Sequence, residues 1–395
     1  MREKLLFEPS LNPSFKRERN STRIFETLEY LSKLFINNTF GIRIIKHPST
    51  IVRVPFFSRK RLKSSLLFVF LLTFSSVHAQ DLHFSQFYNS PQNINPALTG
   101  LFHQDKRFVA NLRSQWASVP VPYQTSSLAY DQKILNDGRL GNDILGAGLF
   151  LNYDIAGDAK MQTTQFGGNI AYTRQLSKMH FLSGGFRVLV AQRRFDITAL
   201  TFDNQFIDGT FIPTASTGED FSNFNYSYVD LGAGINWLFQ ISKRMKFHFG
   251  LSVLHLNQPR ATFFDNNDFR QSRRWNLHLD ATVQLADKID LMPAAIFSMQ
   301  EAQQERLFGS ALRYHLDQRF AREKSLIIGT WYRMNDAAIT SFGVSYPTWN
   351  AVVSYDFNTS DFNNATNGNG GVEFSFIYTI TTVKPMKDRK SCPIF

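Results

Sequence analysis

Apolar and polar residues alternate in short segments along most of the chain after residue 105. The clearest segment is 274–285, in which every odd position from Trp275 to Leu285 is apolar and every even position is polar. Segments 227–239, 245–253 and 372–380 show nearly the same pattern. Because successive side chains of a β-strand point to opposite faces, a period of two predicts strands with one apolar and one polar face.

Ten weaker alternating segments fill the intervals between these four, which makes fourteen in all. The clear segments have about nine to twelve residues, the length that a tilted strand needs to cross a bilayer. An even number suits a bacterial barrel that starts and ends on the periplasmic side. We therefore predict an all-β fold, a transmembrane outer-membrane β-barrel of about 14 antiparallel strands within residues 106–382. The ten weaker segments are 106–117, 123–133, 144–154, 161–174, 180–192, 289–299, 305–315, 325–334, 338–346 and 348–357.

The connections between these segments support the same arrangement. If the first strand runs outward, the long polar loops 193–225, 258–272 and 358–371 all follow odd-numbered strands, where a barrel has its outer loops. Several connections after even-numbered strands are short, although the one at 131–143 is too long for this rule. A soluble β-sandwich or periplasmic barrel is the alternative, because its strands alternate too. The aromatic residues on the apolar faces favour lipid.

A secretory leader precedes the alternating region. Residues 59–80 read RKRLKSSLLFVFLLTFSSVHAQ, with a basic start, an apolar run at 66–74 and small residues at the end. This order predicts a signal peptide over residues 58–79 that is cleaved after Ala79. Residues 1–57 show no sustained period, and we expect this upstream extension to be absent from the mature protein. No later segment is apolar enough for a membrane helix.

The position of the leader also explains the charge. The formal net charge is +11, but residues 1–63 contain 14 Lys and Arg and only 5 Asp and Glu. The remaining residues contain 29 Lys and Arg and 27 Asp and Glu, so the exported part is nearly neutral. Nucleic acid is therefore not an expected partner. The single cysteine, Cys392, excludes an intramolecular disulfide and a cysteine-based zinc site.

The sequence contains few candidates for catalysis. It has no HExxH or GxSxG motif, and its histidines have no metal-ligand spacing. His248 and His278 lie on polar strand faces, where ordinary luminal residues are the simpler interpretation. The run from Asp356 to Gly371 is interpreted as a solvated loop, with calcium binding as the alternative. We expect no enzyme activity, no catalytic residues, no cofactor and no metal.

Several separated motifs occur in a specific order along residues 81–395. Together they resemble the PorP/SprF family of type IX secretion and gliding-motility proteins of Bacteroidetes. The resemblance implies a non-enzymatic barrel in the cell outer membrane that supports export or surface attachment of a cargo or adhesin. The motif residues are Phe84, Ser85, Gln86 and Phe87; Asn95, Pro96, Ala97 and Gly100; Arg113, Gln115 and Trp116; Asn152, Tyr153, Asp154, Gly157 and Asp158; and Cys392 and Pro393 in the final CPIF.

The implied partners are outer-membrane lipid, other type IX secretion components on the periplasmic side, and the secreted cargo or surface adhesin. Two alternatives remain: a passive porin or small-solute channel, and an outer-membrane hydrolase, for which the sequence offers no site. The N-terminal segment 80–105 and the tail 383–395, both expected in the periplasm, favour a protein that binds partners.

Physical roles follow for some motif residues. Asn95-Pro96 is a turn dipeptide, and it could fold segment 80–105 back to close the periplasmic end of the barrel. Arg113 and Gln115 share one strand face, so Arg113 would point into the lumen and Trp116 toward the membrane interface. Plain barrel structure and direct partner contact both remain open for these residues.

Overall fold

A computed structural model describes residues 81–115, 123–135, 143–157, 160–196, 200–207, 209–218, 224–263, 269–319, 322–360 and 368–382. The upstream extension, the signal peptide and the tail predicted above lie outside these residues, as do Trp116, Asp158, Cys392 and Pro393. The predictions made for them therefore stay predictions.

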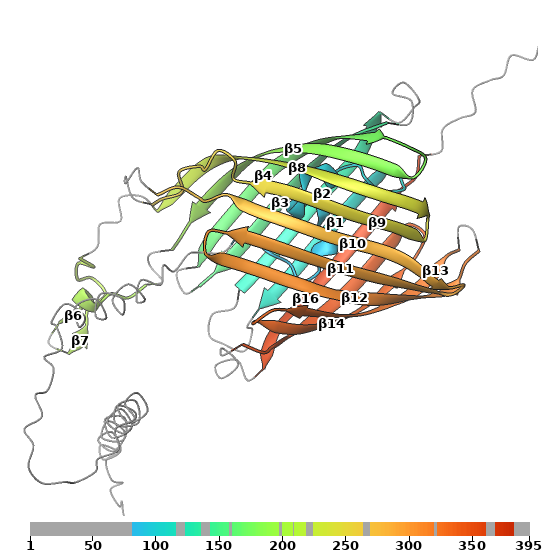
Figure 1. Ribbon diagram of the computed structural model, residues 1–395. Helices are drawn as coiled ribbons and strands as arrows, with labels where there is room; N and C mark the ends of the chain where they lie inside the picture. Colours follow the sequence, from blue (N-terminus) through green and yellow to red (C-terminus); the bar gives the residue numbers. More distant parts are fainter. Residues whose placement is uncertain are drawn as a thin grey trace, which may run out of the picture. The chain divides into compact units, whose positions relative to one another are not determined.

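Fourteen antiparallel strands close into a barrel in which each strand pairs with its neighbours in the chain (Figure 1). The first strand also pairs with the last, from Lys106 opposite Ile380 to Gln115 opposite Gly371, which closes the sheet. The predicted fold class and strand number are confirmed. The strands are β1 (Lys106–Gln115), β2 (Tyr123–Leu135), β3 (Ile144–Ala156), β4 (Met161–Gln175), β5 (His180–Arg194), β8 (Asn225–Ser242), β9 (Met245–Leu254), β10 (Arg274–Ala286), β11 (Ile289–Gln300), β12 (Gln303–Asp317), β13 (Lys324–Arg333), β14 (Ala337–Ser345), β15 (Trp349–Asn358) and β16 (Asn369–Ile380).

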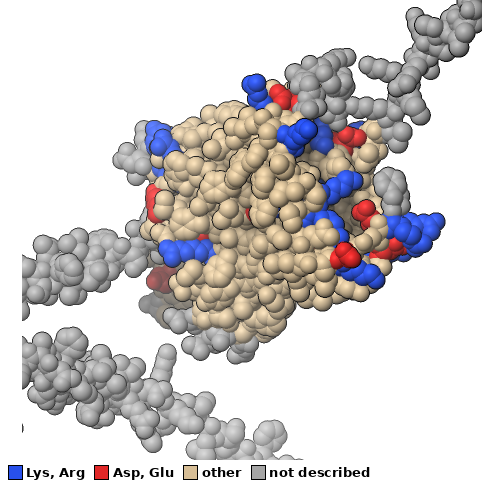
Figure 2. Space-filling model, turned by 45° about the vertical axis from the view of Figure 1, so that its right-hand side comes forward, with Lys and Arg blue, Asp and Glu red and all other residues tan. Residues whose placement is uncertain are grey.

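The two faces of each strand follow the predicted alternation. In β10, Trp275 and Leu279 are 43% and 47% exposed on the outside, whereas Asn276 and His278 are 0% and 2% exposed on the inside. The outer surface is a broad band of uncharged residues, with charged side chains gathered toward its edges (Figure 2). An apolar exterior around a polar interior is the arrangement of a transmembrane barrel, because lipid replaces water on the outside.

The two ends of the barrel differ. At one end the connections after β4, β8, β10 and β14 span four residues or fewer, and β1 begins and β16 ends there; we call it the short-turn end. The opposite end carries the long connections after β5, β9 and β15, and we call it the long-loop end. The connection after β5 contains η4 (Asp203–Gln205) and a small hairpin of β6 (Phe206–Ile207) and β7 (Thr210–Phe211), which the alternation did not predict.

The segment before β1 lies inside the barrel. Residues 81–102, the luminal segment, lie within the barrel (Figure 1) and contain three short helical turns, η1 (Phe87–Asn89), α3 (Pro91–Ile94) and η2 (Pro96–Leu98). Most side chains of this segment are buried. It contacts strand ends at the long-loop end through Asp81 and at the short-turn end through Gly100. None of the helices among the described residues is long and apolar enough to cross a membrane.

This position corrects one prediction. We expected segment 80–105 to lie in the periplasm, where the Asn95-Pro96 turn could fold it back to close that end of the barrel, but residues 81–102 run lengthwise through the lumen. The physical reason is the polar inner wall, which offers hydrogen-bond partners that an apolar core would not. An alternation pattern shows that the wall is polar, but it does not show what fills the space behind it.

The alternation leads to a first prediction. Leu279→Asp places a charge against lipid near the middle of β10 and should lower the free energy of unfolding by about 1–3 kcal/mol. Thr282→Asp on the same strand faces inward opposite Lys246 of β9 and should cost less than about 1 kcal/mol. Urea unfolding of the barrel in lipid vesicles measures both, and equal losses would contradict the assigned faces.

Candidate functional site

The luminal segment is held near the long-loop end by the carboxylate of Glu373 on β16. The backbone N–H of Ser85 donates to Glu373 Oε2 at 2.7 Å, and the N–H of Gln86 donates to Oε1 at 2.9 Å. The Gln86 side chain also donates to Ser354 Oγ at 3.0 Å. Glu373 is only 1% exposed. One buried carboxylate therefore accepts two adjacent backbone amides, a charge-assisted pair that determines the position of this motif.

Two arginines balance the buried negative charge beside this contact. Asp356 Oδ2 lies 3.2 Å from Arg113 Nη2 and 3.3 Å from Arg333 Nη2. Ser85 Oγ donates to the same oxygen at 2.7 Å. Arg113 Nε also lies 3.9 Å from Glu373 Oε2. All these side chains are buried, so the loss of one partner would leave an uncompensated charge inside the protein. We call residues Ser85, Arg113, Arg333, Asp356 and Glu373 the luminal charge cluster.

Asn95 anchors the middle of the luminal segment. Its Oδ1 accepts from the N–H of Ala97 at 2.9 Å and caps η2, whose first residue is Pro96. Its Nδ2 donates to the carbonyl of Ile235 at 2.9 Å. A Cβ at Gly234 would lie 2.1 Å from Asn95 Oδ1, so any larger residue there would displace the Asn95 side chain from its hydrogen bonds. The predicted turn at Asn95-Pro96 thus forms within the lumen.

Gly100 and Asp131 hold the segment near the short-turn end. The N–H of Gly100 donates to Asp131 Oδ2 at 2.8 Å, and Arg107 pairs with the same carboxylate at 2.7 Å. Gly100 has a φ of +73°, and a Cβ on it would lie 2.8 Å from the Cα of Gly146. A residue with a side chain would therefore be strained and too close to β3.

Asp81 attaches the first residue of the luminal segment to the long-loop end of the barrel. Its carboxylate contacts His255 Nε2 and accepts from Gln271 Nε2 at 2.9 Å, while His255 Nδ1 lies 3.0 Å from Asp230. Burial lowers the pKa of His255, but the carboxylates of Asp81 and Asp230 outweigh it and raise that pKa to about 9. Burial raises the pKa of Asp81, yet His255 and nearby arginines hold it well below its usual range. At neutral pH the two groups are therefore a charged pair.

The structure brings many of the motif residues together in the lumen. Phe84, Ser85, Gln86, Asn95, Pro96 and Gly100 are buried there, and Arg113 points inward as predicted. Gln115 is the last residue of β1. Asp154 instead accepts a hydrogen bond from Thr125 at 2.5 Å, and Gly157, with φ +78°, lies in the turn after β3.

Sequence reasoning selected Ser85 and Arg113 but missed the other three residues of the charge cluster, Arg333, Asp356 and Glu373. Glu373 was an unremarked polar position in a clear strand, and a lone acidic residue on an inward face was the only signal available. Asp356 lies at the end of the predicted strand segment 348–357 but was also taken as the first residue of a polar loop; the structure places it inside β15, where it pairs with arginines. Among the described residues, no group of three or more His, Cys, Asp or Glu could hold a metal ion.

Comparison with known proteins identifies the family. Residues 76–378 match the family described as type IX secretion system membrane protein PorP/SprF. The fold and this match place the chain among membrane-spanning β-barrel proteins. The chain belongs to the PorP/SprF family, as the motif resemblance predicted. No curated protein matches it significantly.

Solved structures with a similar fold are distant. The toluene transporter TodX of Pseudomonas putida is 10% identical, with a TM-score of 0.42 over 73% of this chain and 93% of its own. A FadL homologue of Pseudomonas aeruginosa is 11% identical, with a TM-score of 0.40 over 72% and 92%. The KdgM porin is 6% identical, with a TM-score of 0.36 over 69% and 99%. Nothing about the function of this chain follows from these similarities.

The charge cluster leads to a second prediction. Glu373→Gln keeps the side-chain shape but turns an NH2 group toward a backbone amide of Ser85 or Gln86, so two donors face each other. It should lower the free energy of unfolding by roughly 3 kcal/mol and increase hydrogen exchange at residues 84–87. Val372→Ala, a neighbouring change on the outer face, should leave that exchange unchanged. Equal exchange in both variants would contradict the anchoring role.

The Asp81–His255 pair leads to a third prediction. Because the folded pKa of His255 is above its usual 6.5, its stabilising charge is complete below about pH 6.5 and is lost as the pH rises through about 9. The stability difference between the wild type and His255→Gln should therefore shrink from pH 7 to pH 10. Urea unfolding at both pH values measures it. A constant difference would show that the pair does not hold the segment.

Proposed function

We propose that this protein is a non-enzymatic barrel of the cell outer membrane that supports type IX secretion or gliding motility as a binding partner. In this role it assists the export or the surface attachment of a cargo protein or adhesin. Membership of the PorP/SprF family supports the link to type IX secretion. The apolar outer band supports contact with outer-membrane lipid.

The filled lumen is the observation that carries this proposal. A passive porin needs a continuous water-filled path, whereas here the luminal segment bonds to both ends of the barrel and to its middle. Its anchors are buried carboxylates and amides that are costly to release. A barrel closed in this way is better suited to present surfaces to other proteins than to conduct solutes.

The two ends then face different partners. Barrels have short turns on the periplasmic side and longer loops outside, so we place the short-turn end in the periplasm and the long-loop end at the cell surface. Other secretion components would bind at the periplasmic end, where the tail with Cys392 and Pro393 begins. Cargo or adhesin would be met by the long loops after β5, β9 and β15.

A deletion strain tests this function as the fourth prediction. It should lose surface display of one or a few type IX cargo proteins, because their barrel partner is missing, while uptake of small solutes stays normal. Surface labelling of intact cells and growth on small solutes measure the two properties. A chain truncated after Thr382 should show the same loss if the tail docks a partner, provided that immunoblots show normal barrel abundance.

The porin alternative predicts the reverse. A deletion strain would then display every cargo normally and take up small solutes slowly. The purified protein would also conduct steadily in planar bilayers, whereas a filled lumen should give little conductance. Normal display together with open-channel conductance would overturn the proposed function.

A further inference from the structure

Two adjoining cavities open the lumen at the short-turn end, with volumes of about 370 and 590 Å³. They share residues 101–104 of the chain and the side chains of Lys246, His248 and Arg313, so we treat them as one vestibule. The luminal segment forms its inner wall through residues such as Tyr88 and Leu98. A space of this size is typical of ligand pockets. Because the luminal segment forms the inner wall, a ligand would enter the vestibule from the short-turn end.

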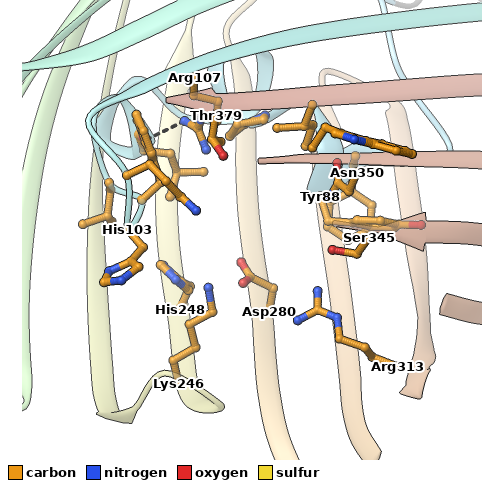
Figure 3. Close-up of a pocket in the computed structure, with 18 of the residues that line it drawn as sticks. Tyr88, His103, Arg107, Lys246, His248, Asp280, Arg313, Ser345, Asn350 and Thr379 are labelled. Atoms are coloured by element: carbon orange, nitrogen blue, oxygen red, sulfur yellow. Dashed lines mark hydrogen bonds between the residues drawn. The ribbon is translucent and has the colours of Figure 1, made fainter. Parts of the chain in front are cut away.

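The lining of the vestibule is rich in positive charge. Lys and Arg gather around a hollow at the right of the molecule in Figure 2, and Figure 3 shows Lys246 and Arg313 directed into the cavity with Asp280 between them. Two lining residues are acidic, Asp280 and Glu323, and six are basic. The six are Arg107, Lys133, Lys243, Arg244, Lys246 and Arg313.

Three of these six basic side chains have no ion pair or hydrogen bond within the described part of the protein. Arg107 pairs with Asp131 at 2.7 Å, and Arg244 pairs with Asp290 at 2.6 Å. In contrast, the side chains of Lys243, Lys246 and Arg313 form no hydrogen bond or ion pair with another described residue, and the buried Nε of Arg313 lacks an acceptor there. Unpaired donors in a partly desolvated cavity are a recognition site for an anion.

Two histidines add to this description. Burial lowers the pKa of His103, and the nearby Lys243, Lys133 and Lys246 lower it further, as expected in a positive field. His248 is 8% exposed and lines both cavities, and among the described residues its ring forms one hydrogen bond, between Nδ1 and the side chain of Asn236. The Nε2 atom of His248 is therefore a further polar group available to a ligand.

We propose that the vestibule binds an acidic segment of a periplasmic protein partner. Carboxylates of that segment would pair with Lys246 and Arg313, and Lys243 at the exposed rim would attract it. Apolar or aromatic side chains beside the carboxylates would rest on Tyr346 and Trp349, which stack at 4.4 Å and line the same cavity. The location of this partner in the periplasm rests on the proposed function, whereas the preference of the site for an acidic ligand rests on its lining residues alone.

The tail of the chain itself is a poor occupant. It follows β16 at the same end, but residues 383–395 contain four Lys or Arg and one Asp. A basic tail and a basic vestibule repel each other. Charge complementarity therefore favours a separate acidic chain, and a tail-deleted protein should bind that chain at least as well as the full one.

Binding of a labelled peptide to the purified full-length protein in nanodiscs gives the fifth prediction. The probe is a fluorescein-labelled peptide of alternating Glu and Phe, and the comparison peptide has Lys in place of Glu. The Glu peptide should bind at least tenfold more tightly than the Lys peptide, and its affinity should fall as salt is raised from 50 to 500 mM, because screening weakens the ion pairs.

Variants locate the binding. Lys246→Gln combined with Arg313→Gln should weaken Glu-peptide binding at least tenfold, and the exposed Lys243→Gln should weaken it about threefold without risk to folding. Lys178→Gln, in the turn between β4 and β5 at the same end but outside the cavity, is the matched control and should change binding less than twofold. Unchanged binding in both vestibule variants, or equal binding of the Lys peptide, would overturn the inference.

A test in cells separates this inference from the proposed function. The double variant should reach normal abundance yet lose cargo display. If it loses the Glu peptide in vitro but displays cargo normally, partner docking at the vestibule is overturned while the proposed function stands. If the deletion strain itself displays all cargo, the proposed function fails, whatever the peptide data show.

Discussion

A barrel of fourteen strands encloses more space than its own inward side chains can fill, and this constraint determines the rest of the structure. The outer face must be apolar to contact lipid, so most polar side chains of the strands face the lumen, beside an apolar patch on β11–β14 that packs against Phe87 and Ile94. Buried polar groups need partners. Here the partners come from the protein's own luminal segment, whose backbone amides at Ser85 and Gln86 are held by Glu373.

The interior is built to accommodate this segment closely. Glycines stand where the segment approaches the wall: a Cβ at Gly185 would lie 2.4 Å from the backbone of Ala97, and one at Gly234 would overlap Asn95. The charged anchors lie at both ends and the neutral Asn95 near the middle, so the segment is restrained along its whole length. The vestibule is the space left between this segment and the short turns, and three of its basic side chains, Lys243, Lys246 and Arg313, have no ion pair with a described residue.

Most of the fold could be predicted from the sequence because a period of two is a local property. The segment 274–285 became β10 (Arg274–Ala286), and the weaker 348–357 became β15 (Trp349–Asn358). The prediction ended this strand at residue 357, whereas β15 ends at Asn358, because a polar run of Asp, Asn and Gly resembles a loop even where its first residues still pair with a neighbouring strand. The hairpin at 206–211 was missed for the related reason that two-residue strands carry no period.

The sequence by itself determined which strand residues lie on the outer face and how many strands form the barrel. Only the tertiary structure decided that Ser85 meets Glu373 and Asp356, which lie some 270 to 290 positions later in the chain. Alternation reports the polarity of a face, but a contact across the lumen depends on closure of the sheet and on the register of strands far apart in sequence. For the same reason, the side chains of Lys246 and Arg313 form one site only after β9 and β12 are placed around a common cavity.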